Sequence, residues 1–143
     1  LVLVSILKGS VVFMADLMRA VSIPCSIDFM VVSSYGGGNT TSTGLVKIIK
    51  DLDGDLSGRD VLIVEDIVDT GHSMDFLYRQ FQARGARSLR LAVLVDKNER
   101  REVPVTSHFV GFTLPSGFVV GYGLDYAESY RELPAIYEAE IEE

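Results

Sequence analysis

Residues 61–74, with the sequence VLIVEDIVDTGHSM, constrain the fold more than any other part of the chain. Four apolar residues predict a buried strand, three carboxylates follow at Glu65, Asp66 and Asp69, and a Thr-Gly-His-Ser turn then opens a helix. Such a strand places its acids at the carboxyl edge of a sheet, where open α/β folds bind their ligands. The turn also leaves free backbone N–H groups at the N-terminus of the helix, and such groups favour phosphate binding. A phosphorylated sugar is therefore the leading substrate class.

Composition predicts one domain over residues 1–143 and excludes several classes of partner. The chain is 48% hydrophobic, enough to bury a sizeable core. Its formal net charge of −7 argues against nucleic acid or an anionic membrane as the main partner. The single cysteine, Cys25, cannot form an internal disulfide, and no signal-peptide pattern is visible. These features lead us to expect a cytoplasmic protein.

Hydrophobic periodicity predicts alternating strands and helices. Ser10 is a candidate N-cap for the first helix, and Gly85 is a candidate C′ residue after the second. The polar, glycine-rich residues 35–44 are either a linker or a lid at the tip of a long hairpin. Strands are expected at 1–7, 26–33, 45–49, 61–64, 87–95, 109–113 and 118–120, and helices at 10–21 and 73–83. This order indicates an α/β sheet with right-handed crossovers.

A receiver domain of the response-regulator type is an alternative, because it also carries acids at a strand end and a lysine on a later strand. Its acidic pair normally follows the first strand, however, and it lacks an Asp-Thr-Gly-X-Ser turn. The order of motifs in this chain therefore disfavours a receiver domain.

Several motifs in the same order resemble the type I phosphoribosyltransferases, and in particular the bacterial hypoxanthine (hypoxanthine-guanine) phosphoribosyltransferases. The matching segments lie between Leu3 and about Pro134, at residues 7–10, 33–36, 46–48, 61–73, 95–97 and 118–131. This resemblance implies a mostly parallel sheet flanked by helices, a small hood and a flexible β-hairpin lid.

The resemblance assigns roles to the acid-rich segment. Glu65 and Asp66 would hold the ribose hydroxyls of phosphoribosyl pyrophosphate, directly or through Mg²⁺. Asp69 would act as general base or acid toward N7 of the purine. The 5′-phosphate would be wrapped by the turn that Asp69 opens, through its N–H groups and two hydroxyls. The remaining turn residues are Thr70, Gly71, His72 and Ser73. We interpret His72 as exposed scaffolding rather than as the base.

On the side of the leaving group, Lys8 and Gly9 would bind pyrophosphate through backbone N–H groups, with a cis peptide bond often preceding the glycine in this family. Arg131 would also contact the pyrophosphate. Ser34 and Tyr35 would begin the lid that closes over the reacting centre and excludes water.

On the side of the base, Lys97 would donate to O6 of a 6-oxopurine, which rejects adenine because adenine presents an amino group there. Phe118 would stack on the purine ring, and the Val119 backbone would read its edge. Asp125 would be a further magnesium ligand, beside Glu65 and Asp66.

The resulting hypothesis is a purine-salvage enzyme. It would transfer the phosphoribosyl group to hypoxanthine or guanine, giving IMP or GMP and pyrophosphate, as a homodimer or homotetramer. The alternatives are the same reaction on another base, such as xanthine or a pyrimidine, and a non-catalytic nucleotide-sensing regulator on the same scaffold. Family members usually carry a few tens of residues before the first strand, so we expect a family segment to be missing here.

Overall fold

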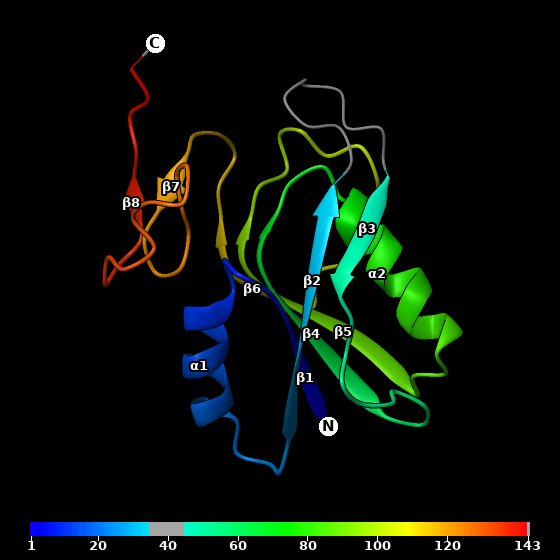
Figure 1. Cartoon of the computed structure of the whole chain (residues 1–143). Coiled ribbons are helices and arrows are strands. Elements are labelled where there is room, and N and C mark those ends of the chain that lie inside the picture. The colour runs from blue at the N-terminus through cyan, green and yellow to red at the C-terminus, as the bar shows by residue number, and fades with distance from the viewer. Residues whose placement is uncertain (35–44, 143) are drawn as a thin grey trace.

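The computed structural model describes residues 1–34 and 45–142 and contains two helices, one on each face of a sheet, within those ranges (Figure 1). The helices are α1 (Val11–Ala20) and α2 (His72–Ala83). The strands are β1 (Val2–Ile6), β2 (Ser26–Ser34), β3 (Val46–Lys50), β4 (Asp60–Val68), β5 (Ser88–Asp96), β6 (Phe109–Thr113), β7 (Val119–Val120) and β8 (Tyr137–Glu138).

Six strands form the main sheet in the order β3-β2-β1-β4-β5-β6. All neighbouring pairs are parallel except β2 and β3, which are the antiparallel arms of the predicted hairpin. The chain leaves β1 for β2 on one side and leaves β4 for β5 on the other. The carboxyl ends of β1 and β4 therefore flank a topological switch point, the position at which open α/β sheets bind ligands.

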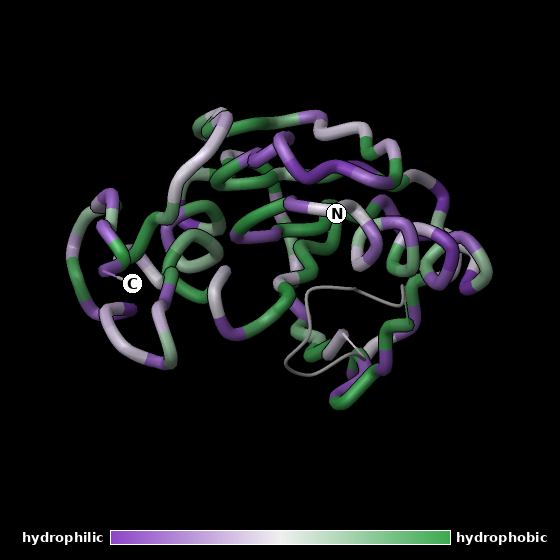
Figure 2. Tube along the Cα trace, turned by 90° about the horizontal axis from the view of Figure 1, so that it is seen from above, coloured by the Kyte–Doolittle hydropathy of each residue, from purple (hydrophilic) through white to green (hydrophobic). Residues whose placement is uncertain are grey.

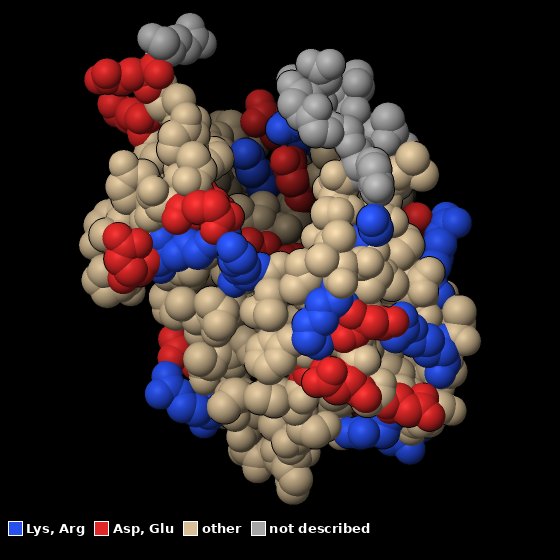
Figure 3. Space-filling view, viewed as in Figure 1, with Lys and Arg blue, Asp and Glu red and all other residues tan. Residues whose placement is uncertain are grey.

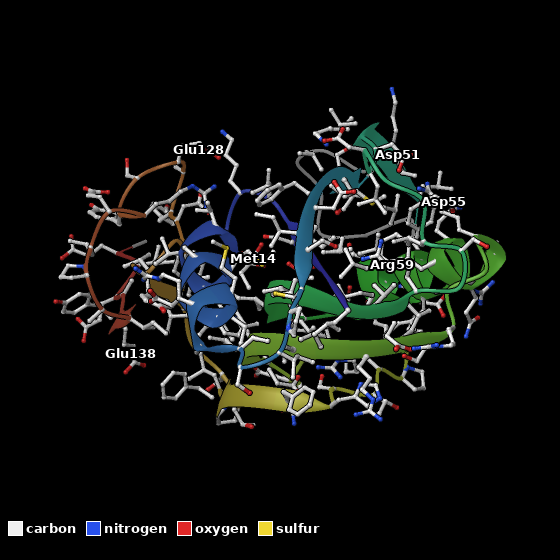
Figure 4. The ribbon with its side chains drawn as sticks, turned by 90° about the horizontal axis from the view of Figure 1, so that it is seen from below. Met14, Asp51, Asp55, Arg59, Glu128 and Glu138 are labelled. Atoms are coloured by element: carbon white, nitrogen blue, oxygen red, sulfur yellow. The ribbon has the colours of Figure 1, made fainter. Side chains whose placement is uncertain are left out.

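The core lies on both faces of this sheet. Val2, Val4 and Ile6 of β1 belong to the same apolar cluster as the buried face of α2, whereas Leu3 packs with α1. Successive strand residues point to opposite faces, so a strand covered on both faces is apolar throughout. Apolar segments accordingly run through the middle of the fold (Figure 2). From α1, Met14 projects toward the sheet and is almost fully buried (Figure 4).

A second, two-stranded sheet of β7 and β8 stands beside the main one (Figure 1). We call residues 117–138, which carry both strands, the hood. The predicted strands at 109–113 and 118–120 exist, but they belong to different sheets, because β6 extends the main sheet in parallel with β5. The sequence analysis did not predict β8, which is only two residues long.

Local details differ from the sequence-based expectations in two places. β4 continues to Val68 because its ladder with β5 extends to the pair Val68 and Asp96, so Glu65 and Asp66 lie within the strand. Ser10 occupies the N-cap position of α1, but its hydroxyl donates to the Ile6 carbonyl at 2.6 Å rather than capping the helix. Gly85 follows α2 with a φ of +82°, as predicted. Neither described helix is long and apolar enough to cross a membrane.

Candidate active site

A hollow between the hood and the main sheet gathers acidic and basic side chains (Figure 3). It lies at the switch point, where the chain leaving β1 meets β4. A Cβ atom on Gly9 would come within 1.7 Å of Asp66 Oδ2, so the loop after β1 passes directly against the acids of β4. The same Gly9 also touches the hood, since a Cβ on Gly123 would lie 2.6 Å from the Gly9 carbonyl oxygen.

The first cavity is formed around the β4–α2 turn, residues 69–73. It has a volume of about 280 Å³ and is lined by this turn together with Ser34, Glu65 and Val46. Gly71 is the N-cap of α2 and has a φ of +96°, a backbone conformation that residues other than glycine rarely adopt. The first N–H groups of α2 have no acceptor within the helix, so they are available to an anion. The turn therefore provides a site of the right size and polarity for a phosphate.

Two adjacent carboxylates of β4 border different cavities: Glu65 lines the first one, and Asp66 lines the one on the hood side. Glu65 is 7% exposed, and both burial and the neighbouring charge of Asp66 raise the pKa of Glu65 well above its usual value. Each carboxylate accepts a hydrogen bond from the next backbone N–H, Glu65 from Asp66 at 3.0 Å and Asp66 from Ile67 at 2.7 Å. Their remaining oxygen lone pairs can accept hydroxyl groups or hold a cation.

A second cavity of about 410 Å³ lies on the hood side, and Asp69 lines both cavities. Asp69 Oδ2 is 3.6 Å from the Arg100 guanidinium. Asp69 Oδ1 is buried, and no hydrogen-bond donor reaches it from the residues that the structure describes. Because a buried carboxylate oxygen normally has a donor, this atom is placed to accept one from a bound molecule.

The second cavity has the lining expected of an aromatic-base site. It is lined by Lys97, which follows β5, and by Phe118 and Val119 of the hood. Phe118 is fixed by an edge-to-face contact with Tyr126, with ring centroids 5.5 Å apart. An aromatic ring and a lysine on one cavity can stack on a flat base and donate to an exocyclic oxygen.

Cationic and anionic groups also meet where the hood faces the loop after β1. Lys8 Nζ is 3.1 Å from Glu128, which in turn is 3.1 Å from Arg131. Arg131 also donates to the Gly123 carbonyl at 2.7 Å and lies 3.4 Å from Asp125. Figure 4 shows Glu128 on the hood loop beside this junction. The cis bond in this loop is Leu7–Lys8, one position earlier than the expected bond directly before Gly9.

Most of the predicted site residues that the structure describes line one of the two cavities, whereas Lys8, Gly9 and Arg131 line neither and lie where the loop after β1 meets the hood. Tyr35 and the glycines of the predicted lid lie outside the described residues, while Ser34 lines the first cavity. Sequence reasoning missed Arg100, which lines the second cavity three positions after Lys97. The basic pair Arg100-Arg101 was the available signal. Tyr126 was also missed, and nothing in its local pattern distinguishes it from other hood aromatics.

The carboxylates of the site can hold Mg²⁺ if waters and substrate oxygens complete its coordination. Among the described residues there is no group of three or more His, Cys, Asp or Glu side chains that could enclose a metal ion. Mg²⁺ is commonly held by one or two carboxylates, with waters and substrate phosphate oxygens completing its octahedron. Asp66 and Asp125 line the same cavity and Glu65 lines the neighbouring one, so each cavity offers carboxylates of this kind.

Comparison with known proteins identifies the family. Residues 1–127 match the family model described as a phosphoribosyl transferase domain. The chain belongs to the phosphoribosyltransferase family. It is 52% identical over 136 residues to the hypoxanthine phosphoribosyltransferase of Salmonella typhimurium, an alignment that covers 95% of this chain and 76% of that protein. It is 50% identical over 134 residues to the hypoxanthine-guanine phosphoribosyltransferase of Streptococcus pyogenes, covering 94% and 74%.

Solved structures agree with the sequence comparison. The crystal structure of a hypoxanthine phosphoribosyltransferase from Staphylococcus aureus superposes with a TM-score of 0.92 at 49% identity, covering 97% of this chain and 75% of that one. A hypoxanthine phosphoribosyl transferase of Trypanosoma cruzi gives a TM-score of 0.92 at 46% identity, covering 98% and 73%. The predicted family and fold class are therefore confirmed.

Proposed function

We propose that this phosphoribosyltransferase acts in purine salvage, transferring the 5-phosphoribosyl group from phosphoribosyl pyrophosphate to N9 of hypoxanthine or guanine. The products would be IMP or GMP and pyrophosphate. The observation that carries this proposal is the position of Asp69 between a phosphate-sized cavity and a base-sized cavity. A carboxylate between a sugar phosphate and a purine can manage a proton on the base while the glycosidic bond forms.

The site divides the reaction among its walls. The β4–α2 turn holds the 5′-phosphate, and Glu65 and Asp66 hold the ribose hydroxyls. Asp69 exchanges a proton with N7 of the purine. Lys8, Gly9 and Arg131 stabilise the departing pyrophosphate as charge develops on it in an oxocarbenium-like transition state. Bound Mg²⁺ would be held by one or two of the carboxylates Glu65, Asp66 and Asp125 together with substrate oxygens, and it would supply further positive charge to the diphosphate.

Base selection follows from the second cavity. The Lys97 ammonium donates to O6 of a 6-oxopurine, Phe118 stacks on the ring, and the Val119 backbone contacts its edge. Adenine would place an amino donor against the lysine, and the unpaired donors would penalise its binding. His72, whose Nε2 is 2.6 Å from Glu102, serves the turn as scaffolding.

The wider assignments rest on the family. Residues 1–143 would work as one phosphoribosyltransferase domain in the cytoplasm, as a homodimer or homotetramer, with Ser34 and Tyr35 beginning the lid over the site. Xanthine is the closest alternative substrate, because it also carries the 6-oxo group that Lys97 would read.

One assay tests the function. Nucleotide formation is measured from hypoxanthine, guanine, xanthine and adenine with phosphoribosyl pyrophosphate, in the presence and absence of Mg²⁺. We expect transfer to hypoxanthine or guanine that requires Mg²⁺, with adenine rejected. Binding of phosphoribosyl pyrophosphate without transfer to any base would instead support a nucleotide-sensing regulator.

The Asp69→Asn variant tests the proton-transfer role. Losing a general acid or base typically costs about 10²–10⁴-fold. We expect kcat to fall by that order, while the dissociation constant of phosphoribosyl pyrophosphate, measured by calorimetry, changes much less. Near-normal turnover in this variant would refute the role of Asp69.

A further inference from the structure

Arg101 makes contacts that place it behind the site rather than in it. Its guanidinium Nε donates to the Asp69 carbonyl oxygen at 2.8 Å, and Nη2 lies 3.5 Å from the Val68 carbonyl oxygen. Nη2 also pairs with the Asp96 carboxylate, and both side chains are 19% exposed. One guanidinium therefore connects the end of β4 to the end of β5.

The residues after Arg101 support the same turn. The N–H groups of Glu102 and Val103 donate to the Thr70 carbonyl at 2.9 and 3.0 Å. The Val103 carbonyl oxygen lies 2.4 Å from the position that a Cβ on Gly71 would take. Residues 101–103, which we call the backing segment, thus contact the turn from Asp69 to His72 along its whole length.

This support matters because the strand ladder stops just before Asp69. The last pair between β4 and β5 is Val68 with Asp96, so the backbone of Asp69 is held by other contacts. Arg101 supplies one of these contacts, because its planar guanidinium can donate to two carbonyls and a carboxylate at once. Arg100, by contrast, lines the second cavity and faces the Asp69 carboxylate. Of the two adjacent arginines, Arg100 therefore lies near the Asp69 side chain, and Arg101 holds the Asp69 backbone carbonyl.

We propose that Arg101 is a positioning residue for phosphoribosyl transfer, fixing the backbone of Asp69 so that its carboxylate stays between the two cavities. This inference rests on the proposed function. A displacement of about 1 Å at a reacting group can cost on the order of 10²-fold in rate. Lysine would keep the charge beside Asp96 but has no fork to hold both carbonyl groups.

A double-mutant cycle tests the proposal. The variants are Arg101→Lys, Asp69→Asn and their combination, with Arg79→Lys as a control, because Arg79 is 77% exposed and pairs with Asp75 on the surface of α2. We expect Arg101→Lys to lower kcat by roughly 100-fold while leaving the KM for the purine nearly unchanged. In the Asp69→Asn background the same change should have little further effect, since the positioned group is already lost. Arg79→Lys should match the wild type.

The outcomes separate this inference from the proposed function. A wild-type protein without transferase activity would overturn both. An active wild type with an equally active Arg101→Lys variant, or with effects that simply add in the double variant, would overturn the positioning role alone. If Arg101→Lys does not fold, judged by thermal unfolding, Asp96→Asn replaces it. That variant frees one side of the guanidinium and should lower kcat roughly tenfold, again only when Asp69 is present.

Discussion

The two sides of the cleft are built in different ways. The turn side is contiguous: β4 runs into Asp69, and residues 69–73 lead directly into α2. The hood side collects its wall from separate stretches, with Lys97 after β5, Phe118 before β7 and Asp125 beyond it. A contiguous wall is fixed largely by local backbone geometry, whereas a composite wall depends on a few long-range contacts. The hood side should therefore be the easier one to displace.

Contacts of this kind hold the hood against the rest of the molecule, and a hydrogen bond inside the hood supports one of them. Gly123 packs against the Gly9 carbonyl oxygen, and Arg131 donates to the Gly123 carbonyl. Tyr122, which has a φ of +54°, donates its hydroxyl to Asp16 of α1. The two outward contacts come from the neighbouring residues Tyr122 and Gly123, so the position of the hood depends on this pair.

Gly9 is the point at which both sides meet, and replacing it should have the largest effect. In Gly9→Ala the new Cβ would overlap Asp66 Oδ2, which lies 1.7 Å from its position. Either the Asp66 carboxylate must leave its position or the loop must move away from β4 toward Gly123 of the hood, and both changes disturb the site. We expect kcat/KM to fall by about 100-fold or more, measured by steady-state nucleotide formation. Overpacking should cost about 1–3 kcal/mol of unfolding free energy.

Gly54→Ala is the matched control. A Cβ on Gly54 would lie 3.5 Å from Asp28 Oδ2, an ordinary van der Waals distance, and Gly54 is far in sequence from both walls. We expect near-normal activity in this variant. If Gly9→Ala were as active as Gly54→Ala, the close approach of the loop to β4 would not matter for the reaction.

The same contrast explains what the sequence could predict. The acids, Gly71 and the opening of α2 lie within one short run, so their joint position followed from strand and helix signals alone. Lys97 and Phe118 share no local pattern, and their pairing across a cavity came from the family resemblance. Arg101 escaped prediction because it donates hydrogen bonds to backbone carbonyls, which can accept from any donor within reach and so leave no signal in the sequence. β8 is too short to show alternation.

Glu65→Gln should show how much unfolding free energy the protein loses by burying an ionisable carboxyl group at the turn side. The folded-state pKa of Glu65 is raised above its unfolded value, first by burial and then by the charge of Asp66. Its contribution to stability is therefore complete below the unfolded pKa and is lost as pH rises through the folded pKa. A glutamine does not ionise, so the variant does not lose stability in this way as the pH rises. We expect the variant to exceed the wild type by roughly 1–2 kcal/mol at about pH 8, and the difference to vanish near about pH 4.

Glu128 on the hood side provides a control of opposite sign. Lys8 and Arg131 lower the pKa of Glu128, so its stabilising contribution exists above the unfolded pKa and is lost as pH falls. Urea unfolding of Glu65→Gln and of Glu128→Gln between acidic and mildly alkaline pH measures the unfolding free energy of each variant against the wild type. An unchanged or lower stability of Glu65→Gln at alkaline pH would show that Glu65 ionises in the fold without penalty. The expected loss of transferase activity in Glu65→Gln would make this site one where function opposes stability.

Tyr122→Phe should have the smallest effect and should be confined to the hood. Burial and the hydrogen bond to Asp16 raise the pKa of Tyr122 to about 12, so the hydroxyl remains a donor throughout the neutral range. Removing a hydrogen bond to a charged group costs about 1.5–3 kcal/mol at most sites and less near the surface. We therefore expect a loss of about 1 kcal/mol in unfolding free energy, a few-fold rise in the KM for the purine and an almost unchanged kcat.

A control variant and an NMR titration show whether the effect of Tyr122→Phe comes from losing the hydrogen bond to Asp16. Tyr137→Phe is the control, because Tyr137 is 48% exposed on β8. Carboxyl titration by NMR reports on the partner: Tyr122, followed by Arg19, lowers the pKa of Asp16, so this pKa should rise toward its ordinary value in Tyr122→Phe and stay low in Tyr137→Phe. If the purine KM and the Asp16 titration both remained as in the wild type, the link between α1 and the hood would not hold the base wall in place. The composite side of the cleft would then owe its position to the packing of Gly123 against Gly9 and to the ion pair between Lys8 and Glu128 instead.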